Sequence, residues 1–319
     1  MNFLSSPRIE GRLVRTLTLA VIVAAGMLTG ASGARAAAIT LGSAANYGVL
    51  IGANETLTTN GLNVTGNIGV AANDKINLSG SISVYGNAYL DSGVTTSGGG
   101  SAYVSGSIVT QSMTSIISAA ASASTTAGAL AGTAGMTSQG GSISLNGSSM
   151  VIKAVQNASE NVLNISSLSL TNGTLTFDDN GYTNAKFIIN VTGAFSATNA
   201  AVIKGINGAS ADDIIFNIEG TGTTVNLTGN SSTSIIGTIL APQRNVNLGG
   251  GGGLSGALIA GVKNTGSSYT VNQSGSGYNI TSLGYTPYTP ASTPEPSSIA
   301  LFGAGFSALI AARRRRQRR

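Results

Sequence analysis

The stretch Val64-Thr65-Gly66-Asn67-Ile68 sets the pattern from which the fold can be deduced. An apolar residue is followed by a hydroxyl residue, a glycine, a small residue and a second apolar residue. Units of this form return at residues 78–82, 104–108, 191–195 and 254–258. Apolar and polar residues alternate around these units, which indicates short β-strands with one face turned toward a core. The glycine at a fixed place in each unit favours a bend or a bulge.

Many short strands that resemble one another weakly predict a β-solenoid, in which each coil is too thin to be stable alone. A β-sandwich is the alternative architecture. The unbroken apolar run from Phe187 to Ile189 predicts a strand covered on both faces. The strongest predicted strands lie at residues 162–165, 175–177, 187–191, 214–218 and 237–242.

One segment, from Gln111 to about Met136, breaks the strand pattern. Its larger apolar residues and several alanines fall on one helical face: Met113, Ile116, Ile117, Ala120, Ala127, Ala131 and Ala134. This spacing predicts a single long α-helix near residues 111–134, packed along the sheet. Three glycines in its second half each weaken the helix by up to about 1 kcal/mol relative to alanine.

Residues 1–36 have the pattern of a secretory signal peptide. Arg8, Arg12 and Arg15 precede an apolar stretch at 17–28, and Ala34-Arg35-Ala36 provides a cleavage site. A single N-terminal anchor helix is the alternative, but the short apolar stretch and the small residues after it favour cleavage. The sequence therefore predicts export.

The C-terminal segment joins three features in series. Pro294, Glu295 and Pro296 form an extended peptide, because proline disfavours helix. An apolar run follows, and then the arginines that would stop the chain at the cytoplasmic face of a membrane: Arg313, Arg314, Arg315 and Arg316. A helix from residue 297 to 312 would be roughly 24 Å long, against roughly 30 Å for a comfortable span. A plain anchor or an interfacial helix is therefore the alternative interpretation.

This arrangement resembles the PEP-CTERM sorting signal of exported bacterial proteins. The resemblance implies that a membrane protease-transpeptidase, an exosortase, recognises the Pro294-Glu295-Pro296 stretch and removes the tail. It also implies passage through the inner membrane to the cell surface or extracellular matrix of a Gram-negative bacterium.

The body of the chain carries two further resemblances. Residues 161–166, 187–193, 237–242 and 256–261 are similar to bacterial surface domains of the choice-of-anchor A type. The opening stretch, residues 41–50, resembles the start of the ice-binding β-solenoid family. That family has a β-helix with a long α-helix along it, in the order that the strand and helix patterns predict here. The resemblances imply an adhesive or an ice-binding surface protein.

Charge and composition limit the possible functions. The net charge of +5 comes from the two ends, since residues 37–312 hold six basic against ten acidic side chains. The basic balance is thus a property of the targeting segments and does not indicate nucleic-acid binding. The chain has no histidine and no cysteine, which removes the usual general base, the usual zinc ligand and thiol chemistry. We therefore expect no enzymatic activity, no cofactor and no metal.

Two acidic stretches and two threonine pairs are candidates for binding. Asp178-Asp179-Asn180-Gly181 partly resembles a calcium loop, although its spacing is incomplete, and Asp212-Asp213 is typical of a turn. Solvated turns are the simpler interpretation of both. Thr56 with Thr58, and Thr174 with Thr176, place two hydroxyls on one strand face. Stacked in a solenoid, such pairs would form the flat array that ice binding requires, whereas threonine is also common in ordinary strands.

Taken together, these patterns predict a mainly β protein: a β-solenoid with one long α-helix alongside, a signal helix at the N-terminus and a transmembrane helix at the C-terminus. The expected function is that of an exported, membrane-sorted structural or adhesive protein; an ice-binding surface protein is the alternative. The expected partners are the membrane, an exosortase and extracellular polysaccharide or a matrix protein, without nucleic acid. The predicted segments are a signal peptide at 1–36, the solenoid at 37–283, a linker at 284–293 and the sorting signal at 294–319.

Overall fold

Three sheets of nine strands each form the body of the protein. The structure is a computed structural model that describes residues 39–155, 160–263, 267–275 and 277–287. All of these belong to one compact unit, residues 38–289, which has its own hydrophobic core. Within them, no helix is long and apolar enough to cross a membrane. The predicted signal peptide, sorting motif and arginine stop lie outside the described residues.

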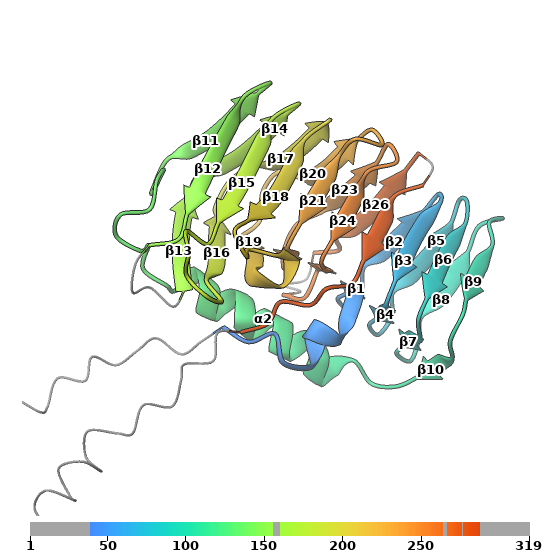
Figure 1. The fold of residues 1–319 in the computed structure, drawn as a ribbon. Coiled ribbons are helices and arrows are strands. Elements are labelled where there is room, and N and C mark those ends of the chain that lie inside the picture. Colours follow the sequence, from blue (N-terminus) through green and yellow to red (C-terminus); the bar gives the residue numbers. More distant parts are fainter. Residues whose placement is uncertain (1–38, 156–159, 264–266, 276, 288–319) are drawn as a thin grey trace, which may run out of the picture. The chain divides into compact units, whose positions relative to one another are not determined.

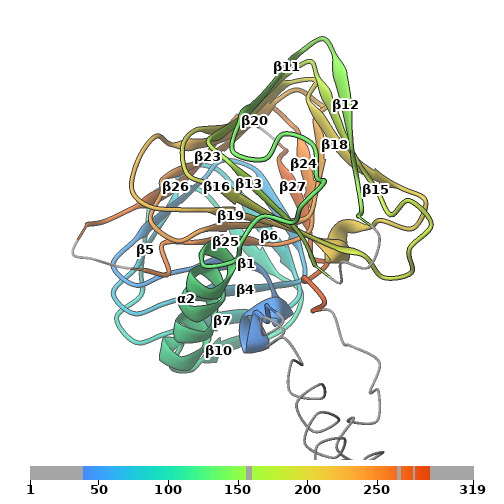
Figure 2. The same cartoon turned by 90° about the vertical axis from the view of Figure 1, so that its left-hand side faces the viewer.

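Consecutive strands go to different sheets, so each full coil contributes one strand to each sheet, and the sheets form three sides around a common interior (Figure 2). Sheet A consists of β1 (Tyr47–Ile51), β4 (Asn67–Val70), β7 (Ala88–Leu90), β10 (Ile108–Thr110), β13 (Glu160–Ile165), β16 (Lys186–Val191), β19 (Ile214–Ile218), β22 (Thr238–Ala241) and β25 (Leu258–Ala260). Sheet B consists of β2 (Thr56–Thr59), β5 (Lys75–Leu78), β8 (Thr95–Ser97), β11 (Ser142–Asn146), β14 (Ser167–Thr171), β17 (Phe195–Asn199), β20 (Val225–Gly229), β23 (Val246–Gly249) and β26 (Thr270–Ser274). Sheet C consists of β3 (Leu62–Thr65), β6 (Ile82–Tyr85), β9 (Ala102–Val104), β12 (Ser149–Lys153), β15 (Thr174–Asp178), β18 (Val202–Ile206), β21 (Ser234–Ile236), β24 (Gly253–Ser255) and β27 (Asn279–Thr281).

Parallel pairing in three sheets confirms the predicted mainly β solenoid and rules out the β-sandwich. The order of the coils, however, does not follow the chain. Sheet A runs β10-β7-β4-β1-β25-β22-β19-β16-β13, so the first coils build from the middle toward one end. In the chain, helix α2 (Thr114–Gly128) follows the first coils and precedes the later ones. The later coils begin at the opposite end of the solenoid and stack back toward the middle. There β25 pairs with β1, with Leu258 opposite Val49, and Figure 1 shows the first and last strands side by side.

The interior of the solenoid is filled by alternate residues of all three sheets. The side chains of Phe177, Phe187 and Phe216 lie here, with ring centroids 5.1 Å apart for the first two. Strand β16 is buried along its whole length, as its apolar run predicted. Its Phe187 and Ile189 point into the interior, whereas Ile188 lies on the outer face of sheet A, in a second apolar cluster that includes α2.

Helix α2 covers the outer face of sheet A (Figure 2). It is shorter than the predicted helix: it ends at Gly128, and both Ala131 and Ala134 are exposed beyond it. The glycine and the following turn explain the early end, because glycine is a poor helix former. The buried face of the helix consists of Ile116, Ala120, Ala123, Ser124 and Ala127.

A ladder of three asparagines fastens the helix to the sheet. Asn164, Asn190 and Asn217 occupy equivalent positions on β13, β16 and β19, and neighbouring side chains are hydrogen-bonded at 2.9 Å. Each amide nitrogen also donates to a backbone carbonyl of the helix or of the turn after it: Leu130, Ala127 and Ser124, at 3.1, 2.8 and 3.1 Å. Three helical residues rise about 4.5 Å and parallel strands lie about 4.8 Å apart, so the two repeats match.

The glycine units of the sequence mark the corners between sheets. Gly66 lies between β3 and β4 with a φ of 129°, and Gly86 occupies the same corner one coil further on. A Cβ at Gly86 would stand 2.3 Å from the carbonyl oxygen of Gly66. The predicted bend is therefore present, and the close stacking of corners in adjacent coils adds a second reason for glycine.

The body continues beyond Leu283. Tyr285 is buried in the cluster beneath α2, together with residues of the short 3-10 helix η1 (Gly42–Asn46). The backbone nitrogen of Thr286 donates to the carbonyl oxygen of Asp212 at 2.8 Å, in a second 3-10 helix, η2 (Ala211–Asp213). Residues 285 and 286, in the predicted linker, are thus part of the packed unit.

Candidate functional site

The outer face of sheet B presents an uninterrupted row of small polar side chains, which we call the polar row. One residue from each of the nine strands lies in register in this row. All its members carry a hydroxyl or an amide. In spatial order they are Ser144, Ser169, Ser196, Asn226, Asn247, Asn272, Thr58, Asn77 and Ser97.

The polar row contains no charged residue; Ser144 is exposed and the other members are half-buried. A neighbouring row on the same face runs through Thr171, Thr198 and Thr228, and the hydroxyls of the first two lie 3.3 Å apart. In the polar row itself, Asn247 donates to the side-chain oxygen of Asn226 at 3.2 Å. Strand spacing repeats these groups about every 4.8 Å. The face therefore offers many hydrogen-bond donors and acceptors in a regular array.

The structure separates the two threonine pairs that the sequence analysis grouped together. Thr56 and Thr58 lie on β2 in sheet B, and Thr58 belongs to the polar row. Thr174 and Thr176 lie on β15 in sheet C, where Thr176 is buried. The idea that the two pairs stack into one face is wrong, because their strands belong to different sheets.

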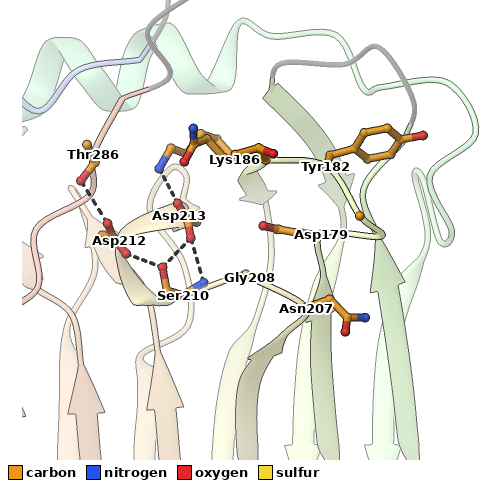
Figure 3. Close-up of a pocket in the computed structure, with 12 residues that line it drawn as sticks. Asp179, Tyr182, Lys186, Asn207, Gly208, Ser210, Asp212, Asp213 and Thr286 are labelled. Carbon is orange, nitrogen blue, oxygen red and sulfur yellow. Dashed lines mark hydrogen bonds and ion pairs between the residues drawn. The ribbon is translucent and has the colours of Figure 1, made fainter.

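The two acidic stretches, in contrast, meet at one pocket on the corner between sheets C and A (Figure 3). Asp179 follows β15, and Asp212 and Asp213 form η2 after β18, one coil further along. The pocket has a volume of about 430 Å³. Its lining is almost entirely polar: Asp179, Gly181, Tyr182, Thr183, Asn184, Lys186, Asn207, Gly208, Ser210, Asp212, Asp213 and Thr286.

A buried ion pair forms one wall of this pocket. The ammonium of Lys186, at the start of β16, contacts the carboxylate of Asp213. Asp213 also caps η2 by accepting from the backbone nitrogen of Ser210 at 2.8 Å. Asp212 accepts hydrogen bonds from the hydroxyls of Ser210 and Thr286. Because removing one partner of a buried pair leaves an uncompensated charge, Lys186 and Asp213 hold each other in place.

Asp179 is the unsatisfied member of the group. Its side chain is 2% exposed, and its Oδ1 has no hydrogen-bond partner among the described residues. Figure 3 shows its carboxylate pointing into the pocket, toward the side where Asp213 lies. Burial, and then the negative charge of Asp213, raise the pKa of Asp179 to about 6. In the adjacent residue, the amide of Asn207 lowers the pKa of Asp178 instead.

The calcium interpretation finds no support here: the described part of the chain contains no group of three acidic, histidine or cysteine side chains placed to hold a metal ion. Lys186 is the pocket residue that the sequence patterns did not single out. A signal was present, because a lone lysine stands between Ala185 and the apolar run that begins at Phe187. A charged residue next to a strand that is buried on both faces requires a buried partner.

Comparisons with known proteins place these features in context. The sequence matches the ice-binding-like adhesive domain over residues 21–271 and the PEP-CTERM protein-sorting motif over residues 292–316. The latter agrees with the interpretation of Pro294, Glu295 and Pro296 as a sorting signal. A search of curated proteins finds no match.

Among solved structures, the fold is similar to an ice-binding protein from an Antarctic biological consortium, with a TM-score of 0.52 and 20% identity over 78% of this chain and 91% of that one. It is also similar to an ice-binding protein of the Antarctic ascomycete Antarctomyces psychrotrophicus, with a TM-score of 0.50 and 17% identity over 78% and 99% of the chains. A glycosylated ice-binding protein from an Arctic yeast gives a TM-score of 0.50 and 17% identity over 80% and 96%. At these identities the likeness concerns the fold.

Proposed function

Since the chain belongs to the family of ice-binding-like adhesive domains and ends in a PEP-CTERM sorting motif, we propose that it is an exported surface protein whose body adheres to extracellular polysaccharide or a matrix protein. The proposed location is the cell surface or extracellular matrix of a Gram-negative bacterium, reached through the inner membrane. Its role is structural and adhesive, without catalysis or a cofactor.

The polar row on sheet B is the observation that carries this proposal. Nine strands present hydroxyls and amides in register, and these groups both donate and accept hydrogen bonds. A polysaccharide offers the complementary set of hydroxyls at short intervals. With little charge on the face, a partner is selected by shape and by many weak hydrogen bonds instead of by long-range attraction.

Sorting to the cell surface strengthens such weak contacts. Anchored copies are held at high local concentration, so that a second contact forms much more readily than the first. A face of modest affinity thereby supports adhesion between a cell and its matrix. This argument connects the sorting motif at the C-terminus with the polar row on the body.

Asn247→Tyr is expected to weaken adhesion, because a bulky ring in the middle of the polar row prevents a flat partner from lying down. The body, residues 38–289, is applied to immobilised polysaccharide from the producing strain, and retention is measured as an apparent Kd. A loss of about tenfold is expected, equivalent to about 1.4 kcal/mol. Ser255→Tyr, at a comparable central position on the outer face of sheet C, serves as the control.

Equal retention of the Asn247→Tyr variant and the wild-type protein would refute adhesion through sheet B. The same preparation tests the second candidate, ice binding, which is favoured by the regular spacing of hydroxyls and amides and by the ice-binding proteins that share this fold. We expect the body at micromolar concentration to leave the shape of growing ice crystals unchanged. Faceted crystals or thermal hysteresis would make ice binding the better assignment.

Replacing Pro294, Glu295 and Pro296 with alanine is expected to hold the protein in the inner membrane with its arginines attached. The reason is that the exosortase would no longer have its extended, acidic recognition peptide. Cell fractionation and the intact mass of the recovered protein measure the result, and Pro290→Ala, just before the motif, is the control. Normal surface delivery of the triple variant would leave a plain membrane anchor as the explanation.

A further inference from the structure

The pocket between sheets C and A has a charge imbalance that the fold does not resolve. Its lining contains three carboxylates, from Asp179, Asp212 and Asp213, and one ammonium, from Lys186. That ammonium is engaged by Asp213, and the carboxylate of Asp212 accepts from two hydroxyls. Asp179 is left buried, with an oxygen that lacks a hydrogen-bond partner within the described structure. An unpaired buried carboxylate is costly, and a cation with N–H groups would supply both the charge and the missing donor.

The remaining lining indicates what kind of cation fits. The volume of about 430 Å³ is within the range of small-molecule sites and far larger than a single ion needs. Hydroxyl and amide residues make up much of the lining, namely Thr183, Asn184, Asn207, Ser210 and Thr286. An aliphatic amine would leave these hydroxyl and amide groups without partners. A ligand with an ammonium group and several hydroxyls would pair with the carboxylate of Asp179 and with the hydroxyl and amide groups of the lining.

We propose that this pocket binds an amino sugar, with the ammonium group of the sugar on Asp179 and its hydroxyls toward Asn207, Ser210 and Thr286. The proposal rests on the proposed adhesive function, since it makes a sugar with a free amine a specific element within the polysaccharide that the body adheres to. Tyr182 is also among the residues that line the pocket.

The test measures binding of D-glucosamine to the body, residues 38–289, by isothermal titration at pH 7. D-glucose, N-acetyl-D-glucosamine and butylamine are the comparison ligands, since each lacks either the charge or the hydroxyls. Glucosamine is expected to bind about tenfold more tightly than each of them. Only glucosamine has both an ammonium group for Asp179 and a full set of hydroxyls for the polar lining residues. Equal binding of glucose or butylamine, or no saturable binding of glucosamine, would overturn the proposal.

Asp179→Asn keeps the shape of the side chain and removes its charge, so it is expected to reduce the affinity for glucosamine about tenfold or more. Glu219→Gln, an equal change of charge at a partly buried carboxylate outside the pocket, should leave the affinity unchanged. Unaltered binding by Asp179→Asn would place the ligand elsewhere and contradict the assignment. Should that variant not fold, the comparison of the four ligands on wild-type protein still decides.

The pH dependence gives a second readout on the wild-type protein. Asp179 faces the charges of Asp178, Lys186 and Asp213, and its pKa of about 6 means that it ionises between pH 5 and pH 7. A sugar amine remains largely protonated over this range, so the affinity should be about tenfold lower at pH 5 than at pH 7. A flat profile would contradict the role of Asp179.

These results are separable from those on sheet B. Retention on polysaccharide without glucosamine binding would refute the pocket and leave adhesion standing. Glucosamine binding together with unchanged retention of the Asn247→Tyr variant would refute adhesion through sheet B and leave the pocket assignment standing.

Discussion

Asn190→Ala is expected to lower the free energy of unfolding by about 2–4 kcal/mol. The side chain is 2% exposed and stands at the centre of the asparagine ladder. It donates to the carbonyl oxygen of Ala127 and to Asn164, and it accepts from Asn217. Truncation leaves those groups buried with fewer partners, and it loosens the helix from sheet A as well.

Urea denaturation followed by circular dichroism measures this loss. Asn226→Ala is the matched control, because it makes the same chemical change on the outer face of sheet B. Asn226 is only half-buried, and its side-chain oxygen accepts a hydrogen bond from Asn247, so its loss should cost less than about 1 kcal/mol. If both variants unfold at the same urea concentration as the wild-type protein, the ladder does not stabilise the fold.

The stability of the body is expected to fall as the pH rises from 5 to 7, by about 2–5 kcal/mol in the free energy of unfolding. Burial raises the pKa values of Glu55 and Asp74 to about 8 each. The two residues meet at the corner after β1 and β4, where the backbone nitrogen of Glu55 donates to Asp74 at 2.8 Å. Between pH 4 and pH 8 the unfolded chain releases protons that the folded chain keeps, so rising pH favours unfolding, and the effect levels off above about pH 8.

Melting temperatures between pH 5 and pH 8 check this expectation. Glu55→Gln removes one of the two titrating groups and should roughly halve the dependence on pH. Asp91→Asn provides a control: hydrogen bonds, first that from the backbone of Met113, lower the pKa of Asp91, so its contribution is already complete at pH 5. A melting temperature that rises toward pH 7, or an unchanged slope in Glu55→Gln, would contradict the assignment.

The local features of the fold were predictable from the sequence. The alternation of apolar and polar residues predicted the strands. The unit at residues 64–68 predicted a corner, because the bend between two inward-pointing apolar residues requires a glycine there. The order of the coils was not predictable. Val49 pairs with Leu258, and every coil offers a similar edge, so no local pattern distinguishes the correct neighbour. The helix end was predicted near residue 134, because none of the three glycines in the second half of that segment stands out as the stop; the observed end at Gly128 adjoins the turn that meets the asparagine ladder.

Predicting the pocket from the sequence would have required the number of residues in one coil. Lys186 and Asp213 are 27 positions apart, and so are Asn190 and Asn217. This separation is the length of one coil in that part of the chain, so residues so spaced stack on one another. With the coil length known, Lys186 would have been paired with Asp213. The threonine pairs were misjudged for the same reason, because assigning a strand to a sheet requires the number of strands in each coil.

The pairing of β1 with β25 has a consequence for how the molecule matures. The partners lie about 200 residues apart, and such a high contact order slows folding. The first coils lack a neighbour on one side until the last coil has been synthesised, so the middle of the solenoid closes only when nearly the whole body is available. We therefore expect a nascent chain built in this order to keep its middle coils open until the last coil has been made.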